Sequence, residues 1–166
     1  MNAQADGHRA LFPASFDPVT NGHLDMVHRA HSIFPDLVVA VATNVAKQGT
    51  FSVDERLEML QLALADLPAV RITHFDGLLV DFAREIGATV VIRGLRAMAD
   101  FEYEFEMALM NKRLNPEIET LFMMTNQEFF YVSSSRLKEL VQFGANVDPW
   151  VPPIVAKYLR EKLRGR

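Results

Sequence analysis

The chain has 166 residues and no cysteine, which excludes disulfide bonds, thiolate zinc sites and a cysteine nucleophile. Its net charge of −4 argues against a nucleic-acid-binding protein, because such proteins need a basic face to displace counterions from phosphates. Hydrophobic residues make up 49% of the chain and charged residues 23%, so its composition is that of a globular protein with a buried core.

The N-terminus shows no sign of targeting or of membrane insertion. Residues 1–9 lack the apolar stretch of a secretory signal, and no apolar run reaches the roughly 18 residues that a membrane span needs. We therefore expect a cytoplasmic protein without a membrane partner. The length predicts a single domain over residues 1–166, with residues 1–8 as a flexible lead.

Short apolar runs alternate with segments of helical period along the chain. The apolar runs suited to strands are residues 10–12, which Pro13 is expected to end, and then residues 37–42, 89–92 and 121–124; residues 70–75 alternate polar and apolar side chains and are expected to form a further strand. Helices are expected over residues 26–34, 57–67, 82–86, 101–114, 133–143 and 154–163. The alternation predicts a doubly wound, Rossmann-like α/β fold, with a five-stranded parallel sheet, helices on both faces and extra C-terminal helices.

Folds of this class bind ligands beyond the carboxyl ends of the strands, so the loops after the strands matter most. The first such loop contains Ser15 and leads into a helix that Thr20 or Asn21 could cap. The free N–H groups of a helix start suit a phosphate, and His23 in the first turn would add a side-chain donor. The alternative is an ordinary capped turn with a histidine on the surface.

Basic side chains follow the second and fourth strands. Lys47 could reach over a ligand, or it could simply be solvated as most surface lysines are. Arg93 and Arg96 flank Gly94 directly after a buried strand, and guanidinium groups match phosphate oxygens. The competing interpretation is that the arginines pair with carboxylates just downstream, at Asp100, Glu102 or Glu104.

Three serines, Ser133 to Ser135, occupy the expected start of the helix over residues 133–143. One serine would be an ordinary cap, but three offer hydroxyl and N–H groups together, which suits another anion. Groups suited to phosphate thus follow four strands and predict polyphosphate chemistry. The sequence has no G-x-x-x-x-G-K-[ST] motif and no G-x-G-x-x-G motif after a strand. His28 and His31 lack a third ligand, so no metal site is expected there.

Two tetrapeptides point to a known superfamily. Residues 20–23, Thr-Asn-Gly-His, resemble the [TH]-x-G-H signature of the nucleotidylyltransferases, and residues 132–135, Val-Ser-Ser-Ser, resemble their second signature. Residues 16–23, 92–97 and 100–104 resemble bacterial phosphopantetheine adenylyltransferases more closely. The resemblance covers nearly the whole chain. It implies a single nucleotidylyltransferase domain that makes dephospho-coenzyme A and pyrophosphate from ATP and 4'-phosphopantetheine, the penultimate step of coenzyme A biosynthesis.

The resemblance also implies roles for individual residues. His23 matches the histidine that stabilises the transition state, and Ser15, Lys47 and Arg96 complete the expected catalytic set. The residues expected to bind ATP are Ser15, Phe16, His23, Gly94, Leu95, Arg96, Glu104, Phe129, Phe130, Tyr131, Val132, Ser133, Ser134 and Ser135. Those expected in the pantetheine-phosphate site are Ser15, Lys47, Leu79 and Arg93.

Further expectations come with the resemblance. Mg²⁺ would arrive with ATP and take few protein ligands, coenzyme A is a candidate feedback inhibitor, and the family typically forms a homohexamer of two stacked trimers. The family usually has glycine where this chain has Ala14, and a methyl group there would crowd the backbone if the position needed a positive φ.

Three alternatives remain open at this stage. A sister enzyme with another acceptor, such as nicotinamide mononucleotide, would share the fold, although the stretch from Arg93 to Glu104 favours the pantetheine family. A nucleotide sensor without catalysis would have no need of a transition-state donor such as His23. A structural oligomer with an incidental phosphate site would also explain the apolar segment around Met107 and Met110, which is expected to be core or interface.

Overall fold

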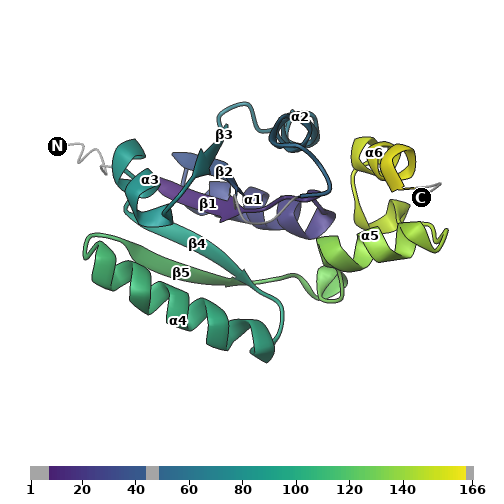
Figure 1. Ribbon diagram of the computed structural model, residues 1–166. Coiled ribbons are helices and arrows are strands. Elements are labelled where there is room, and N and C mark those ends of the chain that lie inside the picture. The colour runs from purple at the N-terminus through teal and green to yellow at the C-terminus, as the bar shows by residue number, and fades with distance from the viewer. Residues whose placement is uncertain (1–7, 44–48, 164–166) are drawn as a thin grey trace.

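The computed structural model describes residues 8–43 and 49–163 (Figure 1). The expected strands all form, and they pair in parallel in a five-stranded sheet of order β3-β2-β1-β4-β5. Their bounds are Ala10–Ala14 for β1, Leu37–Thr43 for β2, Arg71–Asp76 for β3, Val90–Leu95 for β4 and Glu119–Met124 for β5. The doubly wound α/β fold predicted from the alternating pattern is therefore confirmed.

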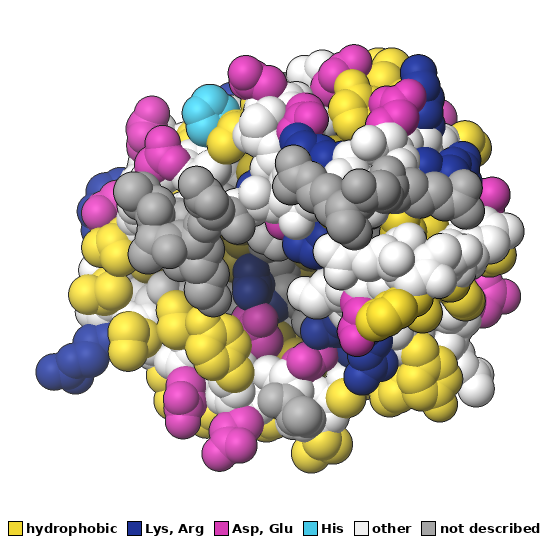
Figure 2. Space-filling model, turned by 45° about the vertical axis from the view of Figure 1, so that its right-hand side comes forward, with side chains coloured by type: hydrophobic (Ala, Val, Ile, Leu, Met, Phe, Trp, Pro, Cys, Tyr) yellow, Lys and Arg dark blue, Asp and Glu magenta, His cyan; other side chains and the backbone are white. Residues whose placement is uncertain are grey.

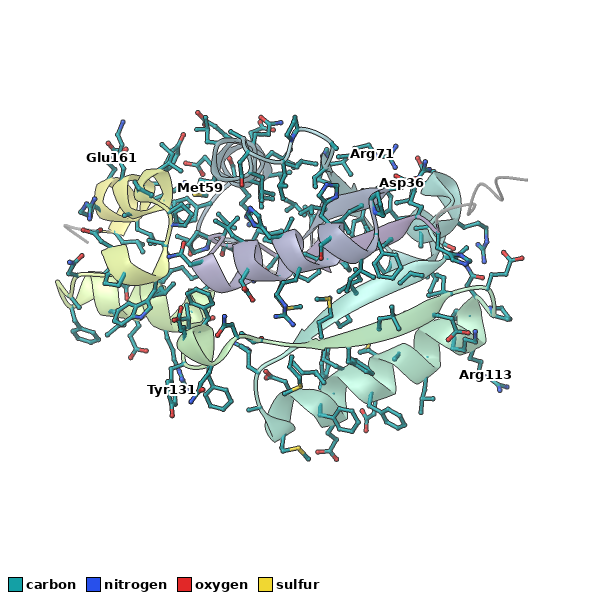
Figure 3. The ribbon with its side chains drawn as sticks, turned by 180° about the vertical axis from the view of Figure 1, so that it is seen from behind. Asp36, Met59, Arg71, Arg113, Tyr131 and Glu161 are labelled. Carbon is teal, nitrogen blue, oxygen red and sulfur yellow. The ribbon has the colours of Figure 1, made fainter. Side chains whose placement is uncertain are left out.

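Helices lie on both faces of the sheet, which Figures 1 and 3 show from opposite sides. One core contains α1 (Asn21–Ile33), α2 (Val53–Ala63), α5 (Ser134–Gln142) and α6 (Pro153–Leu163). The other contains α3 (Leu79–Ile86), and α4 (Met98–Leu114) lies beside α3 and β5. Two 3₁₀ helices, η1 (Gln127–Phe129) and η2 (Asp148–Trp150), flank α5. Within the described residues, no helix is long and apolar enough to cross a membrane.

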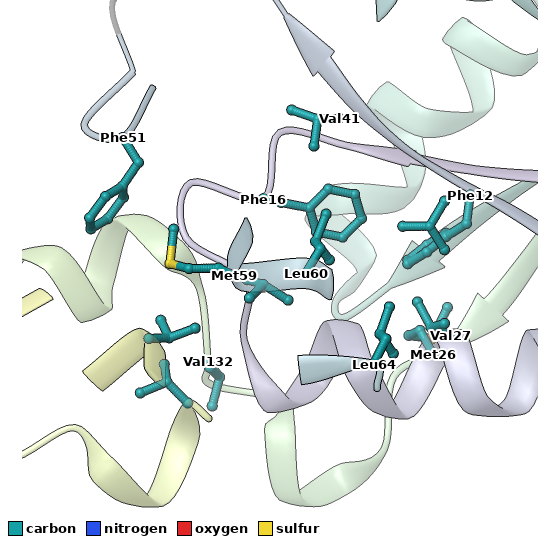
Figure 4. Close-up of a cluster of buried hydrophobic side chains, with 14 of the residues drawn as sticks. Phe12, Phe16, Met26, Val27, Val41, Phe51, Met59, Leu60, Leu64 and Val132 are labelled. Carbon is teal, nitrogen blue, oxygen red and sulfur yellow. The ribbon is translucent and has the colours of Figure 1, made fainter. Parts of the chain in front are cut away.

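Strand β1 and all but the last residue of β2 are apolar because both faces of these strands are covered. In β2, Leu37, Val39 and Val41 enter the core with α1 and α2, whereas Val38 and Ala40 enter the core with α3. Figure 4 shows the larger of these cores, where side chains from β1, β2, α1 and α2 pack together.

The prediction that Pro13 ends the first strand is wrong. β1 continues to Ala14, and Pro13 lies opposite Ala40 of β2 in the ladder. The carbonyl of Pro13 accepts a hydrogen bond from the side chain of Arg93 on β4. In a strand the N–H and C=O of one residue point to the same side, so the missing N–H of Pro13 lies on the β4 side, where β1 has no backbone partner.

The strand order reverses between β1 and β4, since β1 leads to β2 on one side and β4 leads to β5 on the other. These two strands pair only through Ala10 with Val90 and Leu11 with Val91. Past Leu11 they separate, which opens a crevice at their carboxyl ends. Open α/β sheets bind ligands at such a switch point.

Candidate active site

A cavity of about 330 Å³ occupies the crevice between β1 and β4. It brings together both strand ends, the start of α1, the loop after β4 and the start of α5. Figure 2 shows a hollow in the surface in which basic side chains lie beside acidic ones. The residues that line this first cavity are Phe12, Pro13, Ala14, Ser15, Gly22, His23, Met26, Arg93, Gly94, Arg96, Glu104, Thr125, Phe129, Val132, Ser133, Ser134 and Ser135.

The start of α1 sets the orientation and the tautomer of His23. Thr20 is the N-cap, and its hydroxyl oxygen accepts a hydrogen bond from the backbone N–H of His23 at 3.3 Å. In return, the backbone N–H of Thr20 donates to Nδ1 of the His23 ring at 3.1 Å. Because Nδ1 accepts this bond, the proton of the neutral ring lies on Nε2. The capping contact thus makes His23 a hydrogen-bond donor through Nε2.

His23 is neutral at pH 7. Burial lowers its pKa to about 4, and the positive charge of Arg96 acts in the same direction. The ring of Phe16 packs edge-on against the imidazole, with 5.0 Å between the ring centroids. The imidazole is therefore held as a neutral donor within the cavity.

We expect the pKa values of two histidines of α1 to lie on opposite sides of 6.5, the ordinary pKa of histidine. Without ligand, His23 should have its midpoint near pH 4. His28 should titrate above 6.5, because its Nε2 lies 2.7 Å from a carboxylate oxygen of Asp66. NMR titration of the ring signals, assigned with a His23→Gln variant, would measure both midpoints. A midpoint of 6.5 or higher for His23 would contradict its description as a buried neutral donor.

Arg93 is fixed by three hydrogen bonds. Its Nε and Nη2 each donate to the carboxylate of Glu104 at 2.7 Å, and Nη1 donates to the carbonyl of Pro13 at 2.9 Å. The side chains of Arg93 and Glu104 are 29% and 14% exposed, so this bidentate pair is partly desolvated. The carboxylate pairing considered from the sequence is thus present, and Arg93 lines the cavity as well.

Arg96 also combines a cavity position with a carboxylate partner. Its Nε donates to Oδ2 of Asp100 at 3.1 Å. This pair is more exposed than that of Arg93, with side-chain exposures of 41% and 30%, so solvent screens its attraction more strongly. The guanidinium of Arg96 can therefore leave Asp100 for a phosphate at small cost.

The serine triplet stands at the start of α5, as predicted. Ser133 is the N-cap, and its hydroxyl oxygen accepts the N–H of Arg136 at 3.2 Å. The hydroxyl of Ser134 donates to the carbonyl of Pro18 at 2.7 Å, which ties α5 to the loop between β1 and α1. All three serines line the same cavity as His23, so the start of α5, where helix N–H groups lack helical partners, lies at this cavity.

Two glycines allow the walls of the cavity to approach each other. A Cβ at Gly22 would lie 3.1 Å from Cβ of Phe129, and a Cβ at Gly94 would lie 3.3 Å from the methyl carbon of Met26. Both spacings are tight for carbon atoms. A larger residue at Gly22 would push α1 away from η1, whereas one at Gly94 would require the flexible side chain of Met26 to move.

A second cavity of about 250 Å³ adjoins the first and shares Pro13, Arg93 and Glu104 with it. The ends of β2 and β3, the start of α3 and one face of α4 form its largely apolar wall. Its remaining lining residues are Ala42, Thr43, Phe75, Gly77, Leu78, Leu79, Val80, Tyr103, Met107, Ala108, Asn111 and Thr120. The pair of Arg93 and Glu104 therefore stands between a cavity suited to phosphates and an apolar one.

Comparison with known proteins agrees with this geometry. Residues 11–140 match the model of the cytidylyltransferase-like family. The chain is 50% identical over 155 residues to the phosphopantetheine adenylyltransferase of Caldanaerobacter subterraneus subsp. tengcongensis, an alignment that covers 93% of this chain and 97% of the relative. The chain belongs to the phosphopantetheine adenylyltransferase family. Family members from Syntrophus aciditrophicus and Thiobacillus denitrificans are 51% and 50% identical, over 92% and 93% of this chain and 93% and 97% of the relatives.

The family signatures converge in space. The predicted residues that line the first cavity are Ser15, His23, Arg93, Gly94, Arg96, Glu104, Phe129, Val132, Ser133, Ser134 and Ser135. Leu79, predicted for the acceptor site of the family, lines the second cavity. Lys47 lies outside the described residues.

Four residues predicted to bind ATP do not line the first cavity. Phe16 and Leu95 are buried, at 0% and 8% exposure, and Phe16 supports the ring of His23. Phe130 and Tyr131 are exposed beyond η1. A signature does not distinguish a residue that faces the ligand from a neighbour that supports it, because successive side chains point in different directions. Their contact with ATP stays a prediction.

The cavities also contain polar residues that the sequence analysis missed. Thr125 lines the first cavity, and Tyr103, Asn111 and Thr120 line the second. Asn111 is only 9% exposed. It follows Glu104 by seven residues on one face of α4, so helical spacing from Glu104 was the signal that could have found it.

Ala14 causes no backbone strain in place of the glycine usual in the family. Among the described residues other than glycine, Phe16 has a positive φ, of 47°, whereas Ala14 belongs to the extended strand β1. The methyl group of Ala14 is accommodated at the wall of the first cavity.

Proposed function

We propose that this chain transfers the adenylyl group of ATP to 4'-phosphopantetheine, which yields dephospho-coenzyme A and pyrophosphate. The observation that carries the proposal is the pair of adjoining cavities with Arg93 and Glu104 at their boundary. One cavity offers donors for a triphosphate, and the other offers an apolar wall for a pantetheine chain. Relatives about 50% identical over more than nine tenths of the chain are phosphopantetheine adenylyltransferases.

The reaction needs positioning and charge stabilisation more than proton transfer. The acceptor phosphate is already an anion, so it attacks the α-phosphorus of ATP in line without a general base, and pyrophosphate leaves. Nε2–H of His23 and the hydroxyl of Ser15 would donate to the α-phosphate oxygens as they gain charge. A neutral histidine suits this role, because it donates a hydrogen bond without surrendering a proton.

The remaining groups divide between the two substrates. Arg93 would hold the acceptor phosphate at the boundary between the cavities, with Leu79 beside the pantetheine chain and Lys47 as a second cation. Arg96 and the serines at the start of α5 would bind the β- and γ-phosphates. Coenzyme A carries both a pantetheine and an adenylyl part, so it would compete for both cavities as an inhibitor.

Mg²⁺ would be held mainly by the nucleotide. Among the described residues there is no group of three His, Asp or Glu side chains arranged to hold a metal ion. Glu104 supplies the single carboxylate in the described lining of the first cavity, and both of its oxygens bond to Arg93. This donor set fits an ion that retains water and phosphate ligands, and the ion would neutralise charge on the triphosphate.

Pyrophosphate release tests the proposal directly. The protein is incubated with ATP and Mg²⁺, and either 4'-phosphopantetheine or nicotinamide mononucleotide is added as acceptor. We expect release with phosphopantetheine, formation of dephospho-coenzyme A, and loss of both when a chelator removes Mg²⁺. Pyrophosphate release with nicotinamide mononucleotide but not with phosphopantetheine would show that the acceptor is the mononucleotide. ATP binding without pyrophosphate release would favour a nucleotide sensor.

We further propose a homohexamer, the assembly typical of the family, with an apolar surface of α4 and β5 at one of its interfaces. The exposed side chains of this surface are Phe101, Phe105, Leu109, Met110, Leu114, Leu121 and Met124. Surfaces of this kind mark protein interfaces. Leu109→Glu should reduce the molar mass measured by sedimentation, with an unchanged circular dichroism spectrum. A wild-type protein that sediments as a monomer, a dimer or a trimer would contradict the proposal.

A further inference from the structure

A largely buried group of charges lies next to segments that line the first cavity. The carboxylate of Asp17 accepts the N–H of Phe51 at 2.8 Å and the N–H of Thr50 at 2.9 Å. Lys138 donates to the same carboxylate at 2.9 Å, and Nε of Arg56 lies 3.5 Å from it. The lining of the two cavities includes neither Asp17 nor Arg56 nor Lys138.

This group joins two segments that form adjoining walls of the first cavity. Asp17 belongs to the loop between β1 and α1, which also carries Ser15. Lys138 lies on α5, one turn after the serine triplet. Nη1 of Arg56 donates to the carbonyl of Ser15 at 3.3 Å and thereby attaches α2 to the same loop. The ion pair of Asp17 and Lys138 thus connects the two walls with opposite charges, beside the neutral hydrogen bond from Ser134 to the carbonyl of Pro18.

The pair is partly desolvated, and Asp17 is ionised at neutral pH. The side chains of Asp17 and Lys138 are 12% and 22% exposed. Burial raises the pKa of Asp17, but the hydrogen bonds from Thr50, Phe51 and Lys138 together outweigh it, so the pKa lies below the usual value. Solvent therefore screens this attraction less than that of a surface pair.

We propose that Lys138 is a positioning residue that acts through Asp17. It holds the start of α5 at the distance from the loop between β1 and α1 that lets a triphosphate bond to both walls at once. Small displacements matter in such sites, since an error of about 1 Å can cost roughly 10²-fold in rate. This inference rests on one part of the proposed function, which is that the protein binds ATP.

Lys138→Met tests this role because it removes the charge and keeps the side-chain length. Asp17 retains its bonds to Thr50 and Phe51 and remains beside Arg56, so the variant is expected to fold. The matched control is Lys157→Met, which removes a 65% exposed lysine of α6 that lies 3.9 Å from Glu161. Urea unfolding confirms that each variant is folded, and calorimetry without acceptor measures ATP affinity.

We expect Lys138→Met to weaken ATP binding at least about tenfold at both low and high salt, because a displaced wall is not restored by screening. Lys138→Arg should keep the affinity within about threefold, since it retains the charge that pairs with Asp17. Lys157→Met should leave the affinity unchanged.

Three results would overturn the inference. They are an unchanged affinity in Lys138→Met, an equal loss in Lys138→Arg, and a loss that disappears at high salt, which would mark Lys138 as a direct phosphate ligand. A wild-type protein that binds ATP but forms no dephospho-coenzyme A would end the proposed function alone. The comparison of ATP affinities would still decide the role of Lys138.

Discussion

Replacing His23 by alanine should lower kcat about 10²–10³-fold while the affinity for ATP changes little, because the lost donor acts chiefly on charge that develops in the transition state. Thr20 presents the ring through its N–H bond to Nδ1, and burial keeps the ring neutral. Steady-state kinetics of pyrophosphate release, together with calorimetric ATP binding, would separate the two effects.

His28→Ala is the matched control for this variant. His28 lies on the same helix, but its ring is exposed and bonds to Asp66. We expect its kcat to equal that of the wild type. An unchanged kcat in His23→Ala would refute the transition-state role, and a loss confined to ATP affinity would make His23 an ordinary binding residue.

Arg93→Met should have the second large effect, and it should act on the acceptor. The change removes the cation at the boundary of the two cavities and leaves the carboxylate of Glu104 without its bidentate partner. An unpaired, largely buried negative charge beside two phosphate sites repels both substrates. We expect kcat/KM for phosphopantetheine to fall at least about 10²-fold, since the acceptor phosphate loses charge-assisted hydrogen bonds that are worth roughly 1.5–3 kcal/mol each.

A second substitution separates the two causes of that loss. In Arg93→Met with Glu104→Gln, the repelling charge is gone, so kcat/KM should recover at least about threefold relative to Arg93→Met alone. Arg84→Met is the matched control, because Arg84 is 57% exposed on α3 and pairs with Asp81. A double variant no better than Arg93→Met would show that Glu104 does not repel the substrates.

Much of the site could be predicted because its residues fall within local signatures. The start of α1 is one example, since Thr20 caps the helix and His23 completes the capping box within four residues. The serine triplet at the start of α5 is another. In both cases the capping hydrogen bonds join residues close together in the sequence, so a local sequence pattern can predict them.

Other features of the site depend on contacts between distant segments. Asp17 and Lys138 are 121 residues apart in the sequence, and no local sequence pattern at either residue predicts their ion pair. Asn111 enters the second cavity only because α4 lies beside β4 and β5. The burial of Phe16 and the exposure of Tyr131 likewise follow from packing, although both lie in or beside a signature.

The sequence by itself determined the fold class, the family and the set of chemical groups at the strand ends, because periodicity, capping and signatures are local properties. The tertiary structure decided how those groups meet. The separation of β1 from β4 past Leu11 creates the crevice, and it also lets β1 extend through Pro13, whose missing N–H lies on the side where β1 has no backbone partner. Burial, which depends on the whole fold, decided that His23 is a neutral donor.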